Sequence, residues 1–480
     1  MSDPRPFWLA GVPTTGSSSL AVHHPFDGSV VAEVSLADPA QVEAAVAAAH
    51  AVRHEAAGLP AHVRATALDH VARGLAERHE DVARLITAES GKPVRWARVE
   101  VARAASTFRW AAEEARRWAG ELQRLDTEPG ADGRIGLVRR FPRGPVLAIA
   151  PFNFPLNLVA HKLAPAIAVG APVVVKPAPR TPLSSLLLGE LLAETELPAG
   201  MVSVLTVRDD QAMDLVRDER LPVVSFTGSG PVGWMIRDAV PRKHVTLELG
   251  GNAAVVVCAD WSSADDLDRA AQRIATFAVY QGGQSCISVQ RVLADRSVYD
   301  ALVDRVVAAV ERLGVGDPAD EATDVGPLID EASARRVESW VDEAAAAGAK
   351  VLTGGTRDGS TYAPTVLVDV PADAKVACEE VFGPVLVIAP VDGTDQAFAD
   401  VNVSRFGLQA GVFTRDLATA FRAHRELEVG GVVVGDVPSY RADQMPYGGV
   451  KESGVGREGV RYAMEDLSYE RVLVLTGLDL

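Results

Sequence analysis

Cysteine is scarce in this chain. Only three cysteines, Cys258, Cys286 and Cys378, occur among 480 residues. They are too few and too scattered for a disulfide framework or a CxxC metal site, so we expect a reducing, cytoplasmic environment and no bound metal. Cys258 and Cys378 are interpreted as small buried apolar residues. Cys286 follows the glycine-rich sequence QGGQS, which would leave its thiol accessible.

Long apolar runs and an excess of positive charge are also lacking. The uncharged segment 144–161 is interrupted by Pro151 and Pro155, and no segment supplies the about 20 apolar residues that cross a bilayer. The first 20 residues do not show the basic and apolar regions of a secretory signal. With a formal charge of -17, the surface should repel nucleic-acid phosphates and anionic lipids. We therefore expect neither nucleic-acid nor membrane partners.

The composition indicates an ordered protein with more than one core. Hydrophobic residues make up 48% of the chain and charged residues 23%, the balance of a globular protein. At roughly 150 residues per domain, the length suffices for two or three domains. The segment 37–118, with apolar residues at helical spacing, predicts an N-terminal helical layer. The turn-rich sequence 128–133 and the strand-like segment 134–141 then predict a hairpin, which could serve assembly.

Short apolar runs alternate with helical stretches between residues 144 and 249. Continuous runs of this kind predict strands buried on both faces, and their alternation with helices is typical of a parallel, doubly wound sheet. Thr181 followed by Pro182 predicts the start of one helix. The predicted strands are 146–150, 172–176, 201–205, 222–226 and 245–249. A last apolar stretch, 469–475, needs a partner surface, which a neighbouring subunit could supply.

A glycine pattern follows the fourth of these strands. Gly228, Gly230 and Gly233 form a GxGxxG frame immediately before a helical stretch, where backbone N–H groups can bind a pyrophosphate. Alone, the pattern is equally typical of a tight turn. Its position within a strand–helix series favours dinucleotide binding.

Two polar residues lie at predicted strand ends, where ligands bind in parallel sheets. Asn153 follows the strand 146–150, and its amide could donate a hydrogen bond to an oxyanion, although asparagine beside proline is more often a turn residue. Glu248 directly precedes a pair of glycines, so that backbone can approach a ligand next to its carboxylate. A surface glutamate at a strand end is the simpler interpretation.

The order of five residues along the chain resembles that of one family, the aldehyde dehydrogenases, and three motifs extend the resemblance over nearly the whole length. The residues are Asn153, Lys176, Gly228, Glu248 and Cys286. The motifs are EEVFGP at 379–384, FGLQAGVFT at 406–414 and MPYGGVKESGVGREG at 445–459. The chain is most similar to the branch that acts on lactaldehyde, phosphorylated aldehydes and semialdehydes. The resemblance implies a small aldehyde substrate, NAD or NADP as coenzyme, and a homodimer or homotetramer.

The implied fold is α/β, with a Rossmann-type coenzyme domain, an α/β catalytic domain and a small oligomerisation hairpin. The expected boundaries are 1–120, 143–251 and 431–465 for the coenzyme domain, 252–430 for the catalytic domain, and 121–142 and 466–480 for the oligomerisation elements.

The resemblance also implies catalytic roles. Cys286 would be the nucleophile, Glu248 the general base, and Asn153 with the backbone N–H of Cys286 the oxyanion hole. These residue types suit the chemistry, because a thiohemiacetal oxyanion needs preorganised donors and a thioester needs an activated water for hydrolysis. Lys162 and Glu458 match a pair near a proton path behind the base.

The residues that the resemblance assigns to the coenzyme are present, with one departure. In the family, Lys176 would contact the adenosine ribose, Ser229 the pyrophosphate, and Glu380 and Phe382 the nicotinamide ribose. Pro179 stands where NAD-preferring members carry an acid, which removes repulsion toward a 2′-phosphate, so NADP could be accepted. The full predicted set is Lys176, Pro179, Gly228, Ser229, Gly233, Leu249, Gly250, Glu380 and Phe382.

The predicted substrate tunnel is more polar than in members that bind apolar aldehydes. Its residues are Arg103, Asn157, His161 and Arg441. Because guanidinium groups bind oxyanions through paired hydrogen bonds, the two arginines predict an aldehyde with an anionic group. Three alternatives stay open: a CoA-acylating dehydrogenase, a cysteine hydrolase without a redox cofactor, and an inactive homologue.

Overall fold

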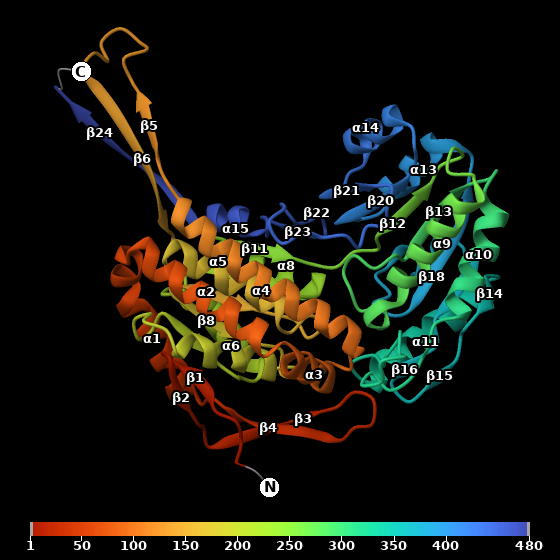
Figure 1. Cartoon of the computed structure of the whole chain (residues 1–480), viewed down its shortest axis with the longest axis horizontal. Coiled ribbons are helices and arrows are strands. Elements are labelled where there is room, and N and C mark those ends of the chain that lie inside the picture. The colour runs from red at the N-terminus through yellow and green to blue at the C-terminus, as the bar shows by residue number, and fades with distance from the viewer. Residues whose placement is uncertain (1–2, 478–480) are drawn as a thin grey trace.

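The computed structural model describes residues 3–477 as two α/β bodies with a narrow sheet projecting from one of them (Figure 1). Residues 1–2, at the start of the expected segment 1–120, and residues 478–480, at the end of the expected segment 466–480, lie outside the described residues. The predicted α/β class is confirmed. Among the described helices, none is long and apolar enough to cross a membrane.

The first body is built on an eight-stranded sheet that contains all five strands predicted between residues 144 and 249. Its strands are β1 (Phe7–Leu9), β2 (Val12–Thr14), β7 (Val146–Ile149), β8 (Val173–Lys176), β9 (Val202–Val204), β10 (Val223–Thr227), β11 (His244–Glu248) and β23 (Gly454–Val455). The order is β2-β1-β9-β8-β7-β10-β11-β23, and the five central strands are parallel. The edge strands β1 and β2 lie before the first predicted element and were not predicted.

Helices cover this sheet and place polar groups beside it. The helices are α1 (Pro39–Gly58), α2 (Ala61–Glu77), α3 (His79–Ser90), α4 (Val94–Arg117), α5 (Asn157–Val169), α6 (Leu183–Ala193), α7 (Ala212–Arg217), α8 (Gly230–Ala239) and α15 (Val460–Asp466), and a separate hairpin is formed by β3 (Ser18–His23) and β4 (Val30–Leu36). The first four are the predicted N-terminal helical layer. All residues of α5 are buried, so its polar residues face the protein interior.

The second body is a three-layer α/β structure. Its sheet has the order β14-β17-β18-β13-β12-β20-β21, with strands β14 (Lys350–Thr353), β17 (Thr365–Val368), β18 (Val385–Val391), β13 (Arg291–Asp295), β12 (Ala254–Val257), β20 (Gln409–Phe413) and β21 (Gly431–Val434). The helices are α9 (Ala264–Val279), α10 (Tyr299–Glu311), α11 (Glu331–Ala346), α12 (Lys375–Cys378), α13 (Gly393–Asn402) and α14 (Leu417–Glu426). The small strands are β15 (Arg357–Asp358), β16 (Thr361–Tyr362), β19 (Phe406–Gly407) and β22 (Val450–Lys451). Along β12, Val255 and Val257 pack with α9 and α10, whereas Val256 packs with α13. Alternate side chains thus bury both faces of the sheet.

The projecting sheet joins segments from distant parts of the chain (Figure 1). Its strands are β5 (Glu121–Arg124), β6 (Arg134–Pro142) and β24 (Ser468–Thr476). β24 pairs antiparallel with β6 over its whole length, from Ser468 opposite Pro142 to Thr476 opposite Arg134. The hairpin and the last strand that the sequence predicts therefore form one unit.

The start of α6 differs from the prediction. Proline occupies the cap position, and Thr181 makes no capping hydrogen bond to the helix. Instead, the carboxylate of Glu89 accepts hydrogen bonds from the backbone N–H groups of Leu183, at 2.7 Å, and Ser184, at 2.9 Å. A side chain distant in sequence thus replaces the predicted local cap, because it supplies two acceptors to otherwise unpaired helix donors.

Candidate active site

Two cavities meet at Cys286. The first, of about 430 Å³, is lined mainly by the ends of the first body's strands and the facing loop of the second body. The second, of about 210 Å³, lies between α4, α5, α9 and the segment before β22. Cys286 and Leu158 line both cavities. A thiol at this junction can contact ligands on either side.

The backbone before Cys286 winds tightly. Gln281, Gly282 and Gly283 have φ angles of 58°, 63° and 71°, in the left-handed region. A Cβ on Gly283 would lie 2.1 Å from the carbonyl oxygen of Gly383, so the close approach of the two loops requires glycine. Burial raises the pKa of the Cys286 thiol to about 12, and a 3.0 Å contact with the hydroxyl of Tyr447 opposes this rise.

Glu248 ends β11 with its carboxylate buried in the first cavity. Neither carboxylate oxygen has a hydrogen-bond partner among the described residues. Burial, and then the nearby charge of Glu458, raise the pKa of Glu248 well above its usual range. An unpaired buried carboxyl with a raised pKa suits a general base.

Asn153 lies on the loop after β7, as predicted. Its Nδ2 donates a hydrogen bond to the backbone carbonyl of Gln284 at 2.9 Å, which fixes the amide next to the Cys286 loop. The amide carries a second N–H, and Asn153 lines the first cavity. The geometry therefore leaves one donor for an oxyanion.

Lys162, Glu458 and Arg441 form a buried ion cluster behind Glu248. Lys162 Nζ lies 3.2 Å from one oxygen of Glu458, and an Arg441 nitrogen lies 3.0 Å from the other. Burial alone would raise the pKa of Glu458, but these two cations hold it well below its usual range. Lys162 also donates to the hydroxyl of Ser225 at 3.0 Å. The predicted Lys162–Glu458 pair is thus brought together.

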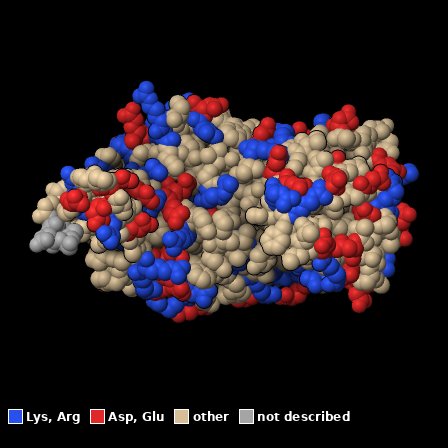
Figure 2. Space-filling view, turned by 90° about the horizontal axis from the view of Figure 1, so that it is seen from above, with Lys and Arg blue, Asp and Glu red and all other residues tan. Residues whose placement is uncertain are grey.

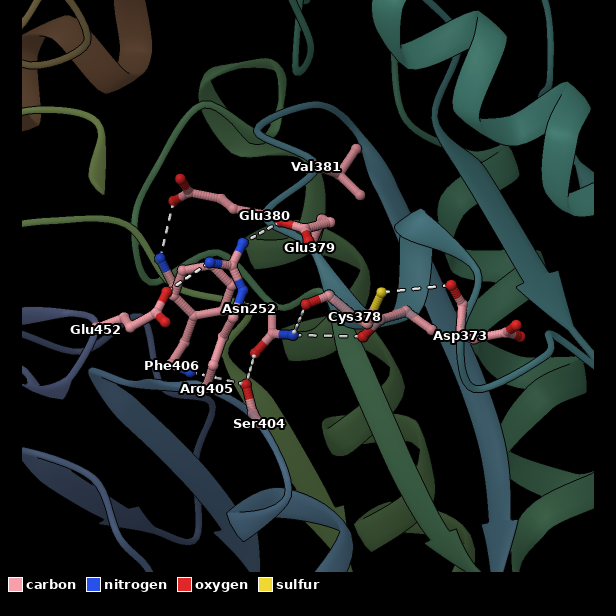
Figure 3. A network of polar contacts seen from close by, with 12 residues as sticks. Asn252, Asp373, Cys378, Glu379, Glu380, Val381, Ser404, Arg405, Phe406 and Glu452 are labelled. Carbon is pink, nitrogen blue, oxygen red and sulfur yellow. Dashed lines mark hydrogen bonds and ion pairs between the residues drawn. The ribbon is translucent and has the colours of Figure 1, made fainter. Parts of the chain in front are cut away.

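Glu380 and Phe382 face the first cavity from the second body. Gly251 donates its backbone N–H to Glu380 at 3.0 Å, and a Cβ on Gly250 would lie 2.1 Å from that carboxylate. Burial raises the pKa of Glu380 to about 7. In Figure 3, Arg405 lies beside Glu380 and between Glu379 and Glu452, with both of which it forms ion pairs. These ion pairs join the loop that carries Glu380 to the turn between β22 and β23.

The GxGxxG frame combines two closely packed glycines with the N-terminus of a helix. A Cβ on Gly228 would lie 2.6 Å from the ring of Phe226, and one on Gly233 would lie 2.4 Å from Leu249, so these two glycines permit close packing. Ser229 is the N-cap of α8, and its side chain makes no capping hydrogen bond. The N-terminus of α8, within a ten-residue helix, is therefore open to an anion.

The predicted ribose site contains an unforeseen carboxylate. Lys176 Nζ lies 2.7 Å from a carboxylate oxygen of Asp209, which is largely exposed. Pro179 follows on the loop after β8, and Arg180 beside it pairs with Asp330 at 3.1 Å rather than facing Lys176.

The second cavity holds three of the four predicted substrate residues. Arg103, Asn157 and Arg441 line it, and Arg103 pairs with Asp443 at 2.9 Å. His161 is not among the lining residues. It is buried behind the cavity, 3.3 Å from Asp443, and burial lowers its pKa to about 4.

Sequence reasoning missed several lining residues. Arg273 and Tyr447 line the second cavity, and Arg336 lines the first. Tyr447 lies within the quoted motif MPYGGVKESGVGREG, so its position in a glycine-rich turn was an available signal. Arg273 lies on the amphipathic helix α9, where nothing distinguishes it from a solvated arginine.

The first cavity fits a dinucleotide. Its wall offers buried polar atoms that have no hydrogen-bond partner among the described residues, on Asn153, Thr227 and Glu248. It also contains the close approach at Gly250 and leads to the open N-terminus of α8. Among the described residues, no group of three or more His, Cys, Asp or Glu side chains could hold a metal ion.

Comparison with known proteins agrees with this geometry. A model of the aldehyde dehydrogenase family matches residues 12–473. The chain belongs to the aldehyde dehydrogenase family. It is 43% identical over 462 residues to a 3-sulfolactaldehyde dehydrogenase of Priestia aryabhattai, covering 96% of each chain. It is 34% identical over 461 residues to a lactaldehyde dehydrogenase of Methanococcus aeolicus, covering 95% of this chain and 97% of the relative.

Solved structures of the family have the same fold. Aldehyde dehydrogenase 21 from Physcomitrella patens, in complex with the reaction product succinate, superposes with a TM-score of 0.97 at 44% identity over 100% of both chains. The NADP-dependent glyceraldehyde-3-phosphate dehydrogenase from Bacillus halodurans C-125, complexed with NADP, has a TM-score of 0.95 at 35% identity and covers 99% of this chain and 100% of that one. This aldehyde dehydrogenase is thus an oxidoreductase that uses NAD or NADP.

Proposed function

We propose that this aldehyde dehydrogenase oxidises a short aldehyde with an anionic group to the carboxylic acid. One observation carries the proposal. Arg441 lines the 210 Å³ cavity that ends at Cys286, and its buried Nε has no hydrogen-bond partner among the described residues. Another nitrogen of the same guanidinium pairs with Glu458, but a buried N–H donor without an acceptor is costly, and an anionic substrate would supply the acceptor.

Two further features support an anionic substrate. Arg103 and Arg273 line the same cavity, and each is half-buried beside a single aspartate. Three of the compared proteins support the same substrate class, since their names give 3-sulfolactaldehyde, glyceraldehyde 3-phosphate and a bound succinate product, whereas the lactaldehyde in the name of a fourth is uncharged. Each of the first three molecules carries a sulfonate, phosphate or carboxylate. Because the cavity is small, the carbon chain between that group and the aldehyde must be short.

The first half of the reaction uses Cys286 and Asn153. The thiolate sulfur bonds to the aldehyde carbon, and the carbonyl oxygen becomes an oxyanion that accepts hydrogen bonds from Asn153 Nδ2 and the Cys286 backbone N–H. NAD or NADP, when bound in the first cavity, would supply the acceptor for the hydride that leaves this carbon. A thioester on Cys286 remains.

The second half uses Glu248. Its carboxylate takes a proton from a water molecule as the water oxygen attacks the thioester carbon, and the thiolate leaves as the carboxylic acid forms. Lys162 and Glu458, next to Glu248, would carry the proton onward. Because Glu248 is available for water, we infer hydrolysis rather than transfer of the acyl group to CoA.

Six of the predicted coenzyme residues line the first cavity, namely Gly228, Ser229, Leu249, Gly250, Glu380 and Phe382, whereas Lys176, Pro179 and Gly233 are not part of its lining. Lys176 would hold the adenosine ribose, Ser229 and the N-terminus of α8 the pyrophosphate, and Glu380 with Phe382 the nicotinamide ribose. Pro179 leaves the 2′ position without its usual acid, which supports use of NADP as well as NAD. Gly228, Gly233, Leu249 and Gly250 would form the closely packed wall.

We also propose the domain division expected from the sequence, with 1–120, 143–251 and 431–465 as the coenzyme domain, 252–430 as the catalytic domain, and 121–142 with 466–480 as oligomerisation elements. The two large sheets and the projecting sheet support this division except at 431–434, because β21 (Gly431–Val434) pairs with β20 in the sheet of the second body. A homo-oligomer and a cytoplasmic location stay predictions.

The proposed substrate class can be tested with two aldehydes of equal carbon number. Succinate semialdehyde, which carries a carboxylate, should give a higher kcat/KM than neutral butanal. Arg103→Leu should raise the KM for succinate semialdehyde about tenfold, the value of one charged hydrogen bond, and leave that for butanal nearly unchanged. Arg116→Leu, on the same helix but paired with Asp69 away from the cavity, is the matched control. A wild-type preference for butanal would refute the anionic substrate.

A further inference from the structure

Tyr447 is the nearest polar partner of the Cys286 sulfur. Its hydroxyl lies 3.0 Å from Cys286 Sγ, and both side chains lie in the cavity wall. The backbone of Tyr447 exchanges two hydrogen bonds with Glu458, of 3.0 Å from Tyr447 N and 2.7 Å from Glu458 N. The phenol therefore projects from an anchored turn, and its distance to the sulfur is set by the fold.

The direction of this hydrogen bond follows from the state of the sulfur. In the resting thiol, either group could donate. A thiolate has no proton, so only the Tyr447 O–H can donate to it, and a hydrogen bond to a charged acceptor is stronger than one to a neutral acceptor. The contact thus favours the ionised sulfur.

We propose that Tyr447 is a catalytic residue that donates a hydrogen bond to the Cys286 thiolate and thereby increases the fraction of ionised nucleophile. The phenol keeps its own proton throughout. This inference rests on the proposed role of Cys286 as the nucleophile and deepens it by naming the group that activates the sulfur.

The other charges around Cys286 leave this task to Tyr447. Burial raises the pKa of Cys286, and the hydrogen bond from Tyr447 is the largest opposing contribution, ahead of Arg441. Glu380 and Glu248, which line the first cavity together with Cys286, raise the pKa of the thiol further. Within residues 3–477, no histidine lines either of the two cavities that contain Cys286.

Arg441 strengthens the donor. Its guanidinium lies over the Tyr447 ring, 3.8 Å from the ring centroid. A cation on the ring face withdraws electron density from the phenol, which makes its O–H a better donor. Burial raises the pKa of Tyr447 well above its usual range, so the phenol stays protonated while it donates.

The test is the pH profile of alkylation of Cys286 by iodoacetamide in the full-length enzyme, followed by inactivation and by mass mapping of the modified peptide. Tyr447→Phe should move the profile to higher pH by about one unit, which means about tenfold slower alkylation at a given pH on its rising part. Tyr440→Phe removes another phenol that lines the same cavity and should leave the profile in place. Coenzyme binding by each variant reports whether it folds.

A second measurement should shift the alkylation profile in the opposite direction. Replacing the 7 tyrosines by 3-fluorotyrosine makes the phenol a stronger donor, so the profile should move to lower pH. The Tyr447→Phe variant should not show this acceleration. An unchanged profile in Tyr447→Phe, or an equal shift in Tyr440→Phe, would overturn the proposal. If Cys286 were not the nucleophile, turnover would instead survive in the Cys286→Ser variant.

Discussion

At the scale of single residues, burial decides how Glu248 behaves. Because burial and Glu458 raise the pKa of Glu248, its ionised fraction increases with pH above the usual range of a carboxyl group. The base form is the ionised one, so the rate of thioester hydrolysis should increase with pH until Glu248 is fully ionised. Steady-state turnover over pH 6–9, with the rate of hydride transfer measured separately by rapid mixing, checks this expectation.

The variant Glu248→Gln should separate the two halves of the reaction. Rapid mixing should show a burst of reduced coenzyme of about one equivalent per site, with little turnover afterwards, because the thioester forms but is not hydrolysed. Cys286→Ala should give neither burst nor turnover and still bind coenzyme. Loss of the burst in Glu248→Gln would place the carboxyl in the first step.

We expect Asp209 to affect the coenzyme preference in a way that Pro179 alone does not indicate. Its carboxylate pairs with Lys176, so the Lys176 ammonium is less available to bind the 2′-phosphate of NADP. In the wild type we expect the NAD and NADP affinities to agree within about tenfold. Asp209→Asn should increase the affinity for NADP relative to NAD by about tenfold, or roughly 1.4 kcal/mol.

The matched control for this coenzyme prediction is Asp210→Asn, which changes the neighbouring carboxylate and has no salt bridge to Lys176. Titration of both coenzymes by tryptophan fluorescence measures the two affinities. A wild-type preference of several hundredfold for NAD would show that another residue excludes the 2′-phosphate.

At the scale of elements, α6 depends on a cap that α3 supplies. Glu89 is completely buried and accepts hydrogen bonds from Leu183 and Ser184. Glu89→Ala should lower the free energy of unfolding by about 1–3 kcal/mol, because two buried helix donors lose their acceptor. Chemical denaturation measures the loss, with Glu77→Ala on the exposed end of α2 as the control. Equal stability of the two variants would contradict the capping role.

At the scale of the whole molecule, the projecting sheet leaves apolar side chains exposed in a single chain. Along β24, the side chains of Val472, Leu473 and Val474 are 55%, 56% and 45% exposed. A narrow sheet of this kind is marginal in water unless another surface covers it. Charged side chains of both signs are interspersed over the face seen in Figure 2, so no broad single-sign field opposes self-association there.

We therefore expect β24 to mediate assembly. Replacing Val472 and Val474 by lysine should lower the molar mass measured by light scattering to that of a smaller species, because buried charges would weaken a subunit contact. Lysine at Val351 and Leu352, which are 39% exposed on the edge strand β14, is the control. An unchanged mass in the β24 variant would mean that assembly uses another surface.

Local pattern and motif determined much of this protein from the sequence alone. The five parallel strands of the first sheet were predicted because buried strands have continuous apolar runs, and the helical layer 37–118, observed at 39–117, because its apolar residues recur at helical spacing. Asn153, Glu248 and Cys286 were singled out because each lies at a strand end or after a glycine-rich turn, and their roles were assigned from the family resemblance. These signals lie within short segments of the sequence, so they can be read without knowledge of the fold.

Only the tertiary structure decided which distant groups meet. Tyr447 reaches Cys286 across 161 positions, and Glu89 reaches Ser184 across 95. His161, predicted in the substrate tunnel, lies behind it, because the buried helix α5 turns that side chain toward Asp443. Hydrogen bonds and ion pairs of this kind depend on the distance between side chains in space, and that distance is fixed by how the sheets and helices pack rather than by neighbours in the chain.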